Sequence, residues 1–334
     1  MNKIQKIGII GSGKMGSDIF NYLSDYNFDI VWYTRNPEHK MTLRETFEKK
    51  IKRQLKHGII DQNIFDLRNN YKITHELSDF SSCDLIIESI IEDQTVKTEF
   101  FNTLERIAKP SCILVSNSSS ILPSVYSQDL NRKNRVAGIH FFYPLAIKNI
   151  TELIFSDSTD DITKESIKLF LESVNRFYIE QDEKNAFILN RFLLEIQIKA
   201  FKLTKSYNLD FKQLDEIAKH VIPDFGLFEM MDHVGHNTMY NSILNYSLMD
   251  TDKRKYQPLL NELSCRISNE KHTTKLFYHY QDSNVIIDKE VQQIIRNILE
   301  EYSKELLLKY SNDFVINLYA FKKALGEFCG IMLK

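Results

Sequence analysis

Cysteine is scarce in this chain. Its 334 residues contain four, Cys83, Cys112, Cys265 and Cys329, and no two of them form a CxxC pair or share a repeated spacing. A disulfide framework and a cysteine-based metal site both depend on such spacings, so neither is expected. We predict that all four are buried thiols and that the protein holds no metal.

An excess of one charge and a long apolar run are also absent. The net charge is −2, and binding of nucleic acid needs a concentrated basic surface, so nucleic acid is not an expected partner. No apolar run approaches the length of a membrane span. The first strand pattern begins at about Lys6, which leaves no room for a signal peptide. We therefore expect a cytoplasmic location and no membrane partner.

The composition predicts a globular protein with a large core. Apolar residues make up 43% of the chain and charged residues 26%, and a chain of this length usually divides into two domains. Strand and helix patterns alternate through the first half, whereas only helical patterns follow Asp182. This order predicts an α/β fold, with a doubly wound Rossmann-like domain over residues 1–183 and an all-α domain over residues 184–334.

A glycine-rich turn stands between the strand pattern Lys6–Ile10 and a run of apolar residues at helical spacing. The turn consists of Gly11, Ser12, Gly13, Lys14, Met15 and Gly16. Glycines in this position let the backbone approach a pyrophosphate, which the helix N-terminus then holds. We predict that these six residues bind a dinucleotide; the alternative is a glycine turn without a ligand.

The end of the second strand pattern bears on the choice of cofactor. An acidic residue there would bind the adenosine ribose 2′-hydroxyl of NAD, but this chain has Thr34 followed by Arg35. A hydroxyl beside a guanidinium can bind the 2′-phosphate of NADP. NADP is therefore at least as plausible as NAD, unless Arg35 is a solvated turn residue.

Further strand and helix patterns complete the first half. Strand patterns cover Asp84–Ile90, Ser111–Val115, Arg135–Phe142, Thr151–Ser156 and Arg176–Glu180, and helical patterns cover Thr42–His57 and Asp161–Val174. Val96, Phe100, Leu104 and Ile107 form the predicted apolar face of another helix, which stops at Pro110. The ligand crevice of such sheets lies beyond the carboxyl ends of the strands, where the run Ser116–Ser120 falls.

In the helical half, Asn190 shares an apolar face with Phe187, Leu194, Ile198 and Phe201. A buried carboxamide without partners costs about 1 to 3 kcal/mol. We expect its partner to be a substrate or the facing domain; the alternative is nearby backbone.

A weak internal similarity runs through the same half. The helix–turn–helix pattern from Leu193 to Leu214 resembles the pattern from Ile298 to Phe321. It predicts two stacked copies, residues 184–285 and 286–334, although coincidental spacing remains an alternative.

Several segments together resemble the 3-hydroxyacyl-CoA dehydrogenase family, in matching order from Lys6 to Tyr280. They are Asn117–Ser120, His140–Pro144, Glu152, Phe187–Arg191, Asp232–Thr238 and Lys271–Tyr280. The family shows SNTSS, GxHFFNP, a following glutamate, GFxxNR, DxxGLDT and GRKTGxGFYxY. Residues 281–334 are similar to the start of the second helical copy in multifunctional fatty-acid oxidation enzymes.

The resemblance implies an enzyme that transfers hydride between NAD or NADP and carbon 3 of an acyl thioester. His140 would be the general base and Glu152 would accept the other ring N–H. Ser119 would bind the reacting oxygen, and Asn190 would position the substrate. Glu92 and Asn117 would lie at the cofactor.

One departure from the family pattern falls beside these residues. Tyr143 stands where the family has asparagine, which adds a ring next to the substrate. The four catalytic positions are intact, so we expect a changed substrate rather than a lost activity. A non-catalytic dinucleotide-binding or structural protein remains the alternative.

The carrier of the acyl group is open between coenzyme A and acyl carrier protein. Lys49, Lys52 and Arg53 lie where the family places its coenzyme A contacts, and their spacing puts them on one helix face. The alternative is a solvated charged face. Family members usually dimerise through the helical domain, so we expect a homodimer, unless residues 281–334 cover that surface within one chain.

Overall fold

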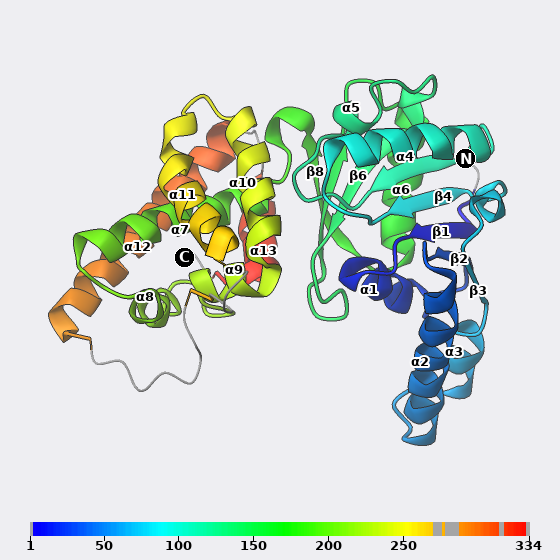
Figure 1. Cartoon of the computed structure of the whole chain (residues 1–334), viewed down its shortest axis with the longest axis horizontal. Helices are drawn as coiled ribbons and strands as arrows, with labels where there is room; N and C mark the ends of the chain where they lie inside the picture. The colour runs from blue at the N-terminus through cyan, green and yellow to red at the C-terminus, as the bar shows by residue number, and fades with distance from the viewer. Residues whose placement is uncertain (1–2, 270–275, 278–286, 314–316, 332–334) are drawn as a thin grey trace. The chain divides into compact units, whose positions relative to one another are not determined.

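The computed structural model describes residues 3–269, 276–277, 287–313 and 317–331. The chain divides into two compact units, Met1–Ala186 and Phe187–Lys334. The first unit is a sheet covered by helices and the second is helical in its described part (Figure 1). The predicted fold class, a doubly wound Rossmann-like domain followed by an all-α domain, is confirmed.

The first unit is built on an eight-stranded sheet with the order β3-β2-β1-β4-β5-β6-β7-β8. The strands are β1 Lys6–Ile10, β2 Asp29–Tyr33, β3 Tyr71–Thr74, β4 Leu85–Glu88, β5 Ile113–Ser116, β6 Val136–Phe141, β7 Ile150–Phe155 and β8 Phe177–Asp182. Strands β1 to β6 are parallel; β7 is antiparallel to β6 and parallel to β8. The carboxyl ends of β1, β4, β5 and β6 therefore meet at one edge, where a ligand crevice is expected.

Helices cover both faces of this sheet. They are α1 Lys14–Leu23, α2 Pro37–Lys56, α3 Gln62–Leu67, α4 Gln94–Ile107, α5 Pro123–Tyr126 and α6 Asp161–Ser173. On β4, Leu85 and Ile87 belong to the core beneath α1 and α6, whereas Ile86 belongs to the core beneath α4. Alternate side chains of a strand point to opposite faces, so a strand buried on both faces reads as the continuous apolar run found here.

Three expectations differ from the structure. The strand β3 was not predicted, because Tyr71–Thr74 is short and a lysine interrupts its apolar pattern. Helix α2 begins at Pro37 rather than Thr42, since the Asn36 side chain accepts a hydrogen bond from the Glu38 amide and caps the helix there. Cys265 is exposed, although the other three cysteines are buried as predicted.

The second unit is arranged around α7. Its helices are α7 Ile188–Ser206, α8 Phe211–Ala218, α9 Leu227–Val234, α10 His236–Met249, α11 Gln257–Asn269, α12 Lys289–Asp313 and α13 Leu318–Cys329. The Phe192 ring of α7 meets Tyr310 of α12 and Phe321 of α13 edge-on, with centroids 5.9 and 5.7 Å apart. The C-terminal helices thus pack on α7 within one chain. None of the described helices is long and apolar enough to cross a membrane.

The two sequence patterns at the end of the chain are only partly covered. Within Lys271–Tyr280 the structure describes Leu276 and Phe277, and the other eight positions lie outside the described residues. The Phe277 amide donates to the Asp232 carboxylate at 2.9 Å, which ties the described pair to α9. The division at 183/184 and the two copies 184–285 and 286–334 stay predictions.

Candidate active site

The glycine turn has the shape that a dinucleotide requires. Gly11 has φ +110°, and a Cβ there would lie 2.2 Å from the Ser89 carbonyl oxygen. A Cβ on Gly16 would lie 2.2 Å from the Gly11 carbonyl oxygen, so α1 can only pack this closely with glycine. A Cβ on Gly13 would meet no described atom within 4 Å, and no described side chain caps α1 at this residue. An open approach to uncapped helix amides fits the pyrophosphate of a dinucleotide.

The end of β2 lies beside this turn. The Trp32 ring N–H donates to the Gly11 carbonyl at 2.9 Å, and the Ser12 hydroxyl donates to that of Thr34 at 3.1 Å. Thr34 is buried, whereas Arg35 is exposed. The turn therefore contacts a hydroxyl at the end of β2, and the chain has no carboxylate at this position, where one would repel a 2′-phosphate.

His140 and Glu152 form a buried pair across the junction of β6 and β7. They are register partners in the antiparallel ladder, and the His140 Nδ1 lies 2.7 Å from the Glu152 Oε2. Gln181 of β8 donates to the Glu152 Oε1 at 3.0 Å. All three side chains are buried. A carboxylate at this distance fixes the orientation of the imidazole ring, as a general base requires.

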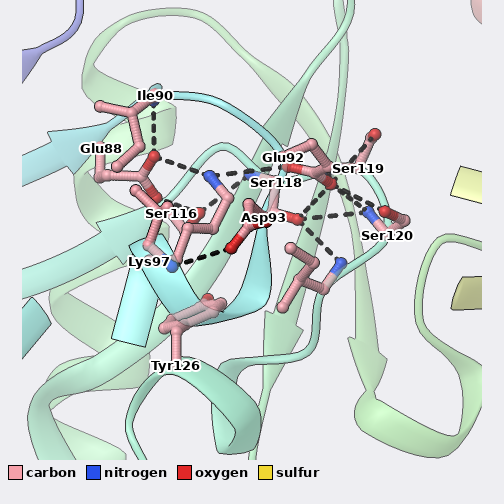
Figure 2. A network of polar contacts seen from close by, with 12 residues as sticks. Glu88, Ile90, Glu92, Asp93, Lys97, Ser116, Ser118, Ser119, Ser120 and Tyr126 are labelled. Atoms are coloured by element: carbon pink, nitrogen blue, oxygen red, sulfur yellow. Dashed lines mark hydrogen bonds and ion pairs between the residues drawn. The ribbon is translucent and has the colours of Figure 1, made fainter. Parts of the chain in front are cut away.

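The loop between β5 and α5 carries Ser118, Ser119 and Ser120 and is held by Glu92 (Figure 2). The Glu92 Oε1 accepts the hydroxyls of Ser118 and Ser120 at 2.6 and 2.8 Å and the amides of Ser119 and Ser120 at 3.0 Å. The Ser119 hydroxyl lies 3.5 Å from the same oxygen. The conformation of the loop is thus set largely by one carboxylate.

A second carboxylate and a lysine lie beside this loop (Figure 2). Lys97 is 1% exposed, with its Nζ 2.7 Å from Glu88 Oε1 and 3.6 Å from Glu92 Oε2. Glu88, fully buried, also accepts the Ile90 amide and the Ser116 hydroxyl, each at 2.6 Å. Burial alone would raise the pKa of Glu92, but Lys97 and the hydrogen bonds of the serine loop outweigh it and hold this pKa below its ordinary value.

The buried face of α4 differs from the one predicted from the sequence. The buried residues of this helix include Lys97, Phe101 and Leu104, whereas Val96 is exposed. A rotation of the helix by about one residue position, relative to the predicted face, directs Lys97 into the interior, where it pairs with Glu88.

Glu88, Lys97 and Gln181 were not predicted from the sequence. The one available signal was a charged residue at the end of an apolar strand, as Glu88 is at the end of β4.

The other predicted residues have varied surroundings. The Asn117 Oδ1 accepts the Phe141 amide at 2.9 Å, which joins the serine loop to the strand of His140. Asn190 belongs to the second unit, where its Nδ2 donates to the Tyr246 hydroxyl at 3.3 Å. A tyrosine of its own unit is thus a partner that the sequence did not predict. Tyr143 is 48% exposed.

The predicted basic face lies on α2. The Nζ atoms of Lys49 and Lys52 are 3.6 and 3.7 Å from carboxylate oxygens of Glu45 and Glu48 on the same helix, and Arg53 is exposed. Helix α2 carries seven lysines and arginines against three glutamates, so the face keeps a positive charge. Exposed pairs of this kind contribute about 0.3 to 0.5 kcal/mol each and leave the cations accessible.

Two family models match the chain. The model described as 3-hydroxyacyl-CoA dehydrogenase, NAD binding domain, matches residues 6–184, and the corresponding C-terminal domain matches residues 187–280. A probable 3-hydroxybutyryl-CoA dehydrogenase of Bacillus subtilis is 28% identical over 260 residues, which are 77% of this chain and 90% of the relative. The human mitochondrial hydroxyacyl-coenzyme A dehydrogenase is 27% identical over 292 residues, 83% of this chain and 92% of that protein.

Solved structures share the fold. The (S)-3-hydroxybutyryl-CoA dehydrogenase PaaH1 of Ralstonia eutropha superposes with a TM-score of 0.72 at 21% identity, over 80% of this chain and 95% of that chain. The Mycobacterium tuberculosis protein FadB2 gives a TM-score of 0.71 at 23% identity, over 79% and 94%. At these identities the likeness concerns the fold.

Proposed function

Because the chain belongs to the 3-hydroxyacyl-CoA dehydrogenase family, whose first domain binds NAD, we propose that it interconverts the 3-hydroxy and 3-keto groups of an acyl thioester with NAD or NADP. The observation that carries the proposal is the buried contact of 2.7 Å between His140 and Glu152. Such a pair suits a proton transfer that accompanies oxidation of an alcohol.

His140, Glu152 and Gln181 have separate roles in this reaction. The cofactor, when bound, accepts or supplies the hydride at carbon 3. His140 takes the hydroxyl proton at Nε2, the ring nitrogen that does not face Glu152, as the O–H bond breaks and the carbonyl forms. Glu152 then holds the Nδ1–H and balances the charge of the imidazolium, while Gln181 fixes the orientation of the carboxylate. In reduction the same proton returns to the oxygen.

Substrate and cofactor contacts follow from the loop and the turn. We assign Ser119 to the reacting oxygen, with Glu92 holding its backbone in place. Asn190 is assigned to substrate binding, as the family resemblance implies. Gly11 to Gly16 bind the pyrophosphate, and Asn117 and Glu92 border the nicotinamide end because they fix the serine loop at the carboxyl ends of β4 and β5.

We propose that Thr34 and Arg35 allow the protein to bind NADP as well as NAD. Thr34→Asp is expected to weaken NADP binding by about tenfold or more, equivalent to 1.4 kcal/mol, because the new carboxylate repels the 2′-phosphate. The same carboxylate can bind the 2′-hydroxyl of NAD, so the affinity for NAD should rise. Dissociation constants from quenching of Trp32 fluorescence, with Thr34→Ser as the matched control, measure both. A preference of the unmodified protein for NAD by about a hundredfold would contradict a role of Arg35 at the phosphate.

The acyl carrier is assigned to coenzyme A, with acyl carrier protein as the alternative. Reduction of acetoacetyl-CoA should be visible as a fall in NAD(P)H absorbance. The charge reversals Lys52→Glu and Arg53→Glu should raise the KM for acetoacetyl-CoA severalfold without changing the KM for the cofactor. Reversal at Lys304 and Lys309, both exposed on α12, is the control. If the acetoacetyl group reacts orders of magnitude faster on a carrier protein, the alternative holds.

Two further assignments remain proposals. A cytoplasmic location agrees with the absence of spanning helices in the described residues. A homodimer would use the helical unit, although α12 and α13 already pack on α7 and bury Leu299 and Phe321. The non-catalytic alternative is disfavoured by the intact pair of His140 and Glu152.

A further inference from the structure

Two contacts join α1 to the loop that follows His140. The Lys14 Nζ lies 4.1 Å from the centroid of the Tyr143 ring. One helical turn later, the Asp18 Oδ2 accepts the Leu145 amide at 2.7 Å. The loop therefore runs along the first turn of the helix whose N-terminus faces the predicted pyrophosphate.

The backbone on both sides of Tyr143 is held in place. Before it, the Phe141 amide donates to Asn117, and after it the Arg176 guanidinium donates to the Leu145 and Lys148 carbonyls at 2.8 and 2.7 Å. Arg176 is 4% exposed. The backbone of Tyr143 therefore stands between two fixed points, which places its side chain near Lys14.

We propose that Tyr143 contributes to cofactor affinity through Lys14, an inference that rests on the proposed function. An ammonium over an aromatic face is attracted by the ring, and its N–H groups on the far side remain available for an anion. Lys14 is the first residue of α1, directly after Gly13, so its ammonium can reach a pyrophosphate at this helix end. Tyr143 holds the ammonium on that side and lowers the cost of ordering a long side chain.

This role differs from the substrate contact predicted for Tyr143 from the sequence. The ring is half-exposed, and it contacts Lys14 of the glycine turn. Asparagine, the usual residue at this place, offers no aromatic face. Lys14 of the glycine turn and Tyr143 of the loop after His140 therefore act together in this chain.

A double-mutant cycle with ADP-ribose tests the proposal. This probe carries the pyrophosphate but no nicotinamide, so calorimetry measures its binding without turnover. Lys14→Met should weaken binding by about tenfold, the value of a charge-assisted hydrogen bond. Tyr143→Leu should weaken it by about two- to fivefold, the value of an exposed cation–π contact. The double variant should bind as weakly as Lys14→Met and no weaker, and Tyr143→Phe, which keeps a ring, should bind like the unmodified protein.

Lys164→Met is the matched control, because this lysine also faces an aromatic ring, that of Phe155 at 5.9 Å, on a different helix. It should leave binding unchanged. Additive losses in the double variant, or no loss in Tyr143→Leu, would overturn the coupling while the proposed function stands. Failure of the unmodified protein to bind ADP-ribose at all would overturn both.

Discussion

Replacement of His140 by glutamine is expected to lower kcat by about a hundredfold or more, with cofactor affinity close to that of the unmodified protein. Glutamine can occupy a similar volume in the buried space beside Glu152, but it has no group that accepts a proton near neutral pH. The loss therefore falls on the chemical step. Initial rates with acetoacetyl-CoA and NAD(P)H, together with cofactor dissociation constants, separate this from misfolding.

Two variants make the result specific. Glu152→Gln keeps the hydrogen bond but removes the charge that stabilises imidazolium, so it should also lower kcat and should shift the pH profile of kcat. His75→Gln is the control, because this histidine also lies near a glutamate, with Nε2 3.1 Å from Glu76 Oε1, but at an exposed position. Turnover of His140→Gln within about threefold of the unmodified enzyme would remove His140 from the mechanism and revive the non-catalytic alternative.

The sequence predicted the elements that carry the site because their signals are local. Ile7–Ile10 is an uninterrupted apolar run next to Gly11 and Gly16, where a side chain would collide with backbone, so strand, turn and helix could be predicted together. His140 and Glu152 lie on two such runs, and an antiparallel pair brings them opposite each other. Their roles came from the order of the motifs, since nothing in the residue types alone separates a general base from a core histidine.

The buried ion pair of Lys97 and Glu88 beside the serine loop could not be predicted in this way. A pattern of apolar residues cannot mark a lysine as buried, so the predicted apolar face included Val96 and gave no indication that Lys97 is buried. The actual rotation depends on Glu88, which comes from another element and is fully buried. Asn190 is a similar case, because its partner Tyr246 lies on α10, 56 residues further along the chain. Pairings of this kind are tertiary and leave no periodic trace.

The pairing also has an energetic consequence, since Lys97→Met should destabilise the first unit by about 3 to 5 kcal/mol. Methionine fills much of the same volume, but the fully buried Glu88 would lose its counter-ion. The single tryptophan, Trp32, is buried against Phe20 in the same unit, so its fluorescence during urea unfolding reports on the affected part. Adding Glu88→Gln to Lys97→Met should restore most of the loss, because a neutral amide needs no counter-ion.

Lys109→Met is the control for this experiment. The Lys109 Nζ pairs with the Asp84 Oδ1 in the same unit, but both side chains are partly exposed, so loss of this pair should cost about 0 to 1 kcal/mol. An equal loss in the two variants would mean that Lys97 contributes only packing.

The pH dependence of the unfolding free energy is an independent test of this electrostatic explanation. In the unmodified protein the pKa of Glu92 is held below its ordinary value, so its contribution to stability is complete above the unfolded pKa of about 4.3 and is lost as the pH falls through the folded pKa. Removal of Lys97 takes away the largest contribution that lowers this pKa, so the pKa of Glu92 in the folded state rises. The variant then loses less stability on acidification than the unmodified protein does. The difference in unfolding free energy between Lys97→Met and the unmodified protein should therefore shrink as the pH falls below about 4.3, whereas a purely steric defect would leave it constant.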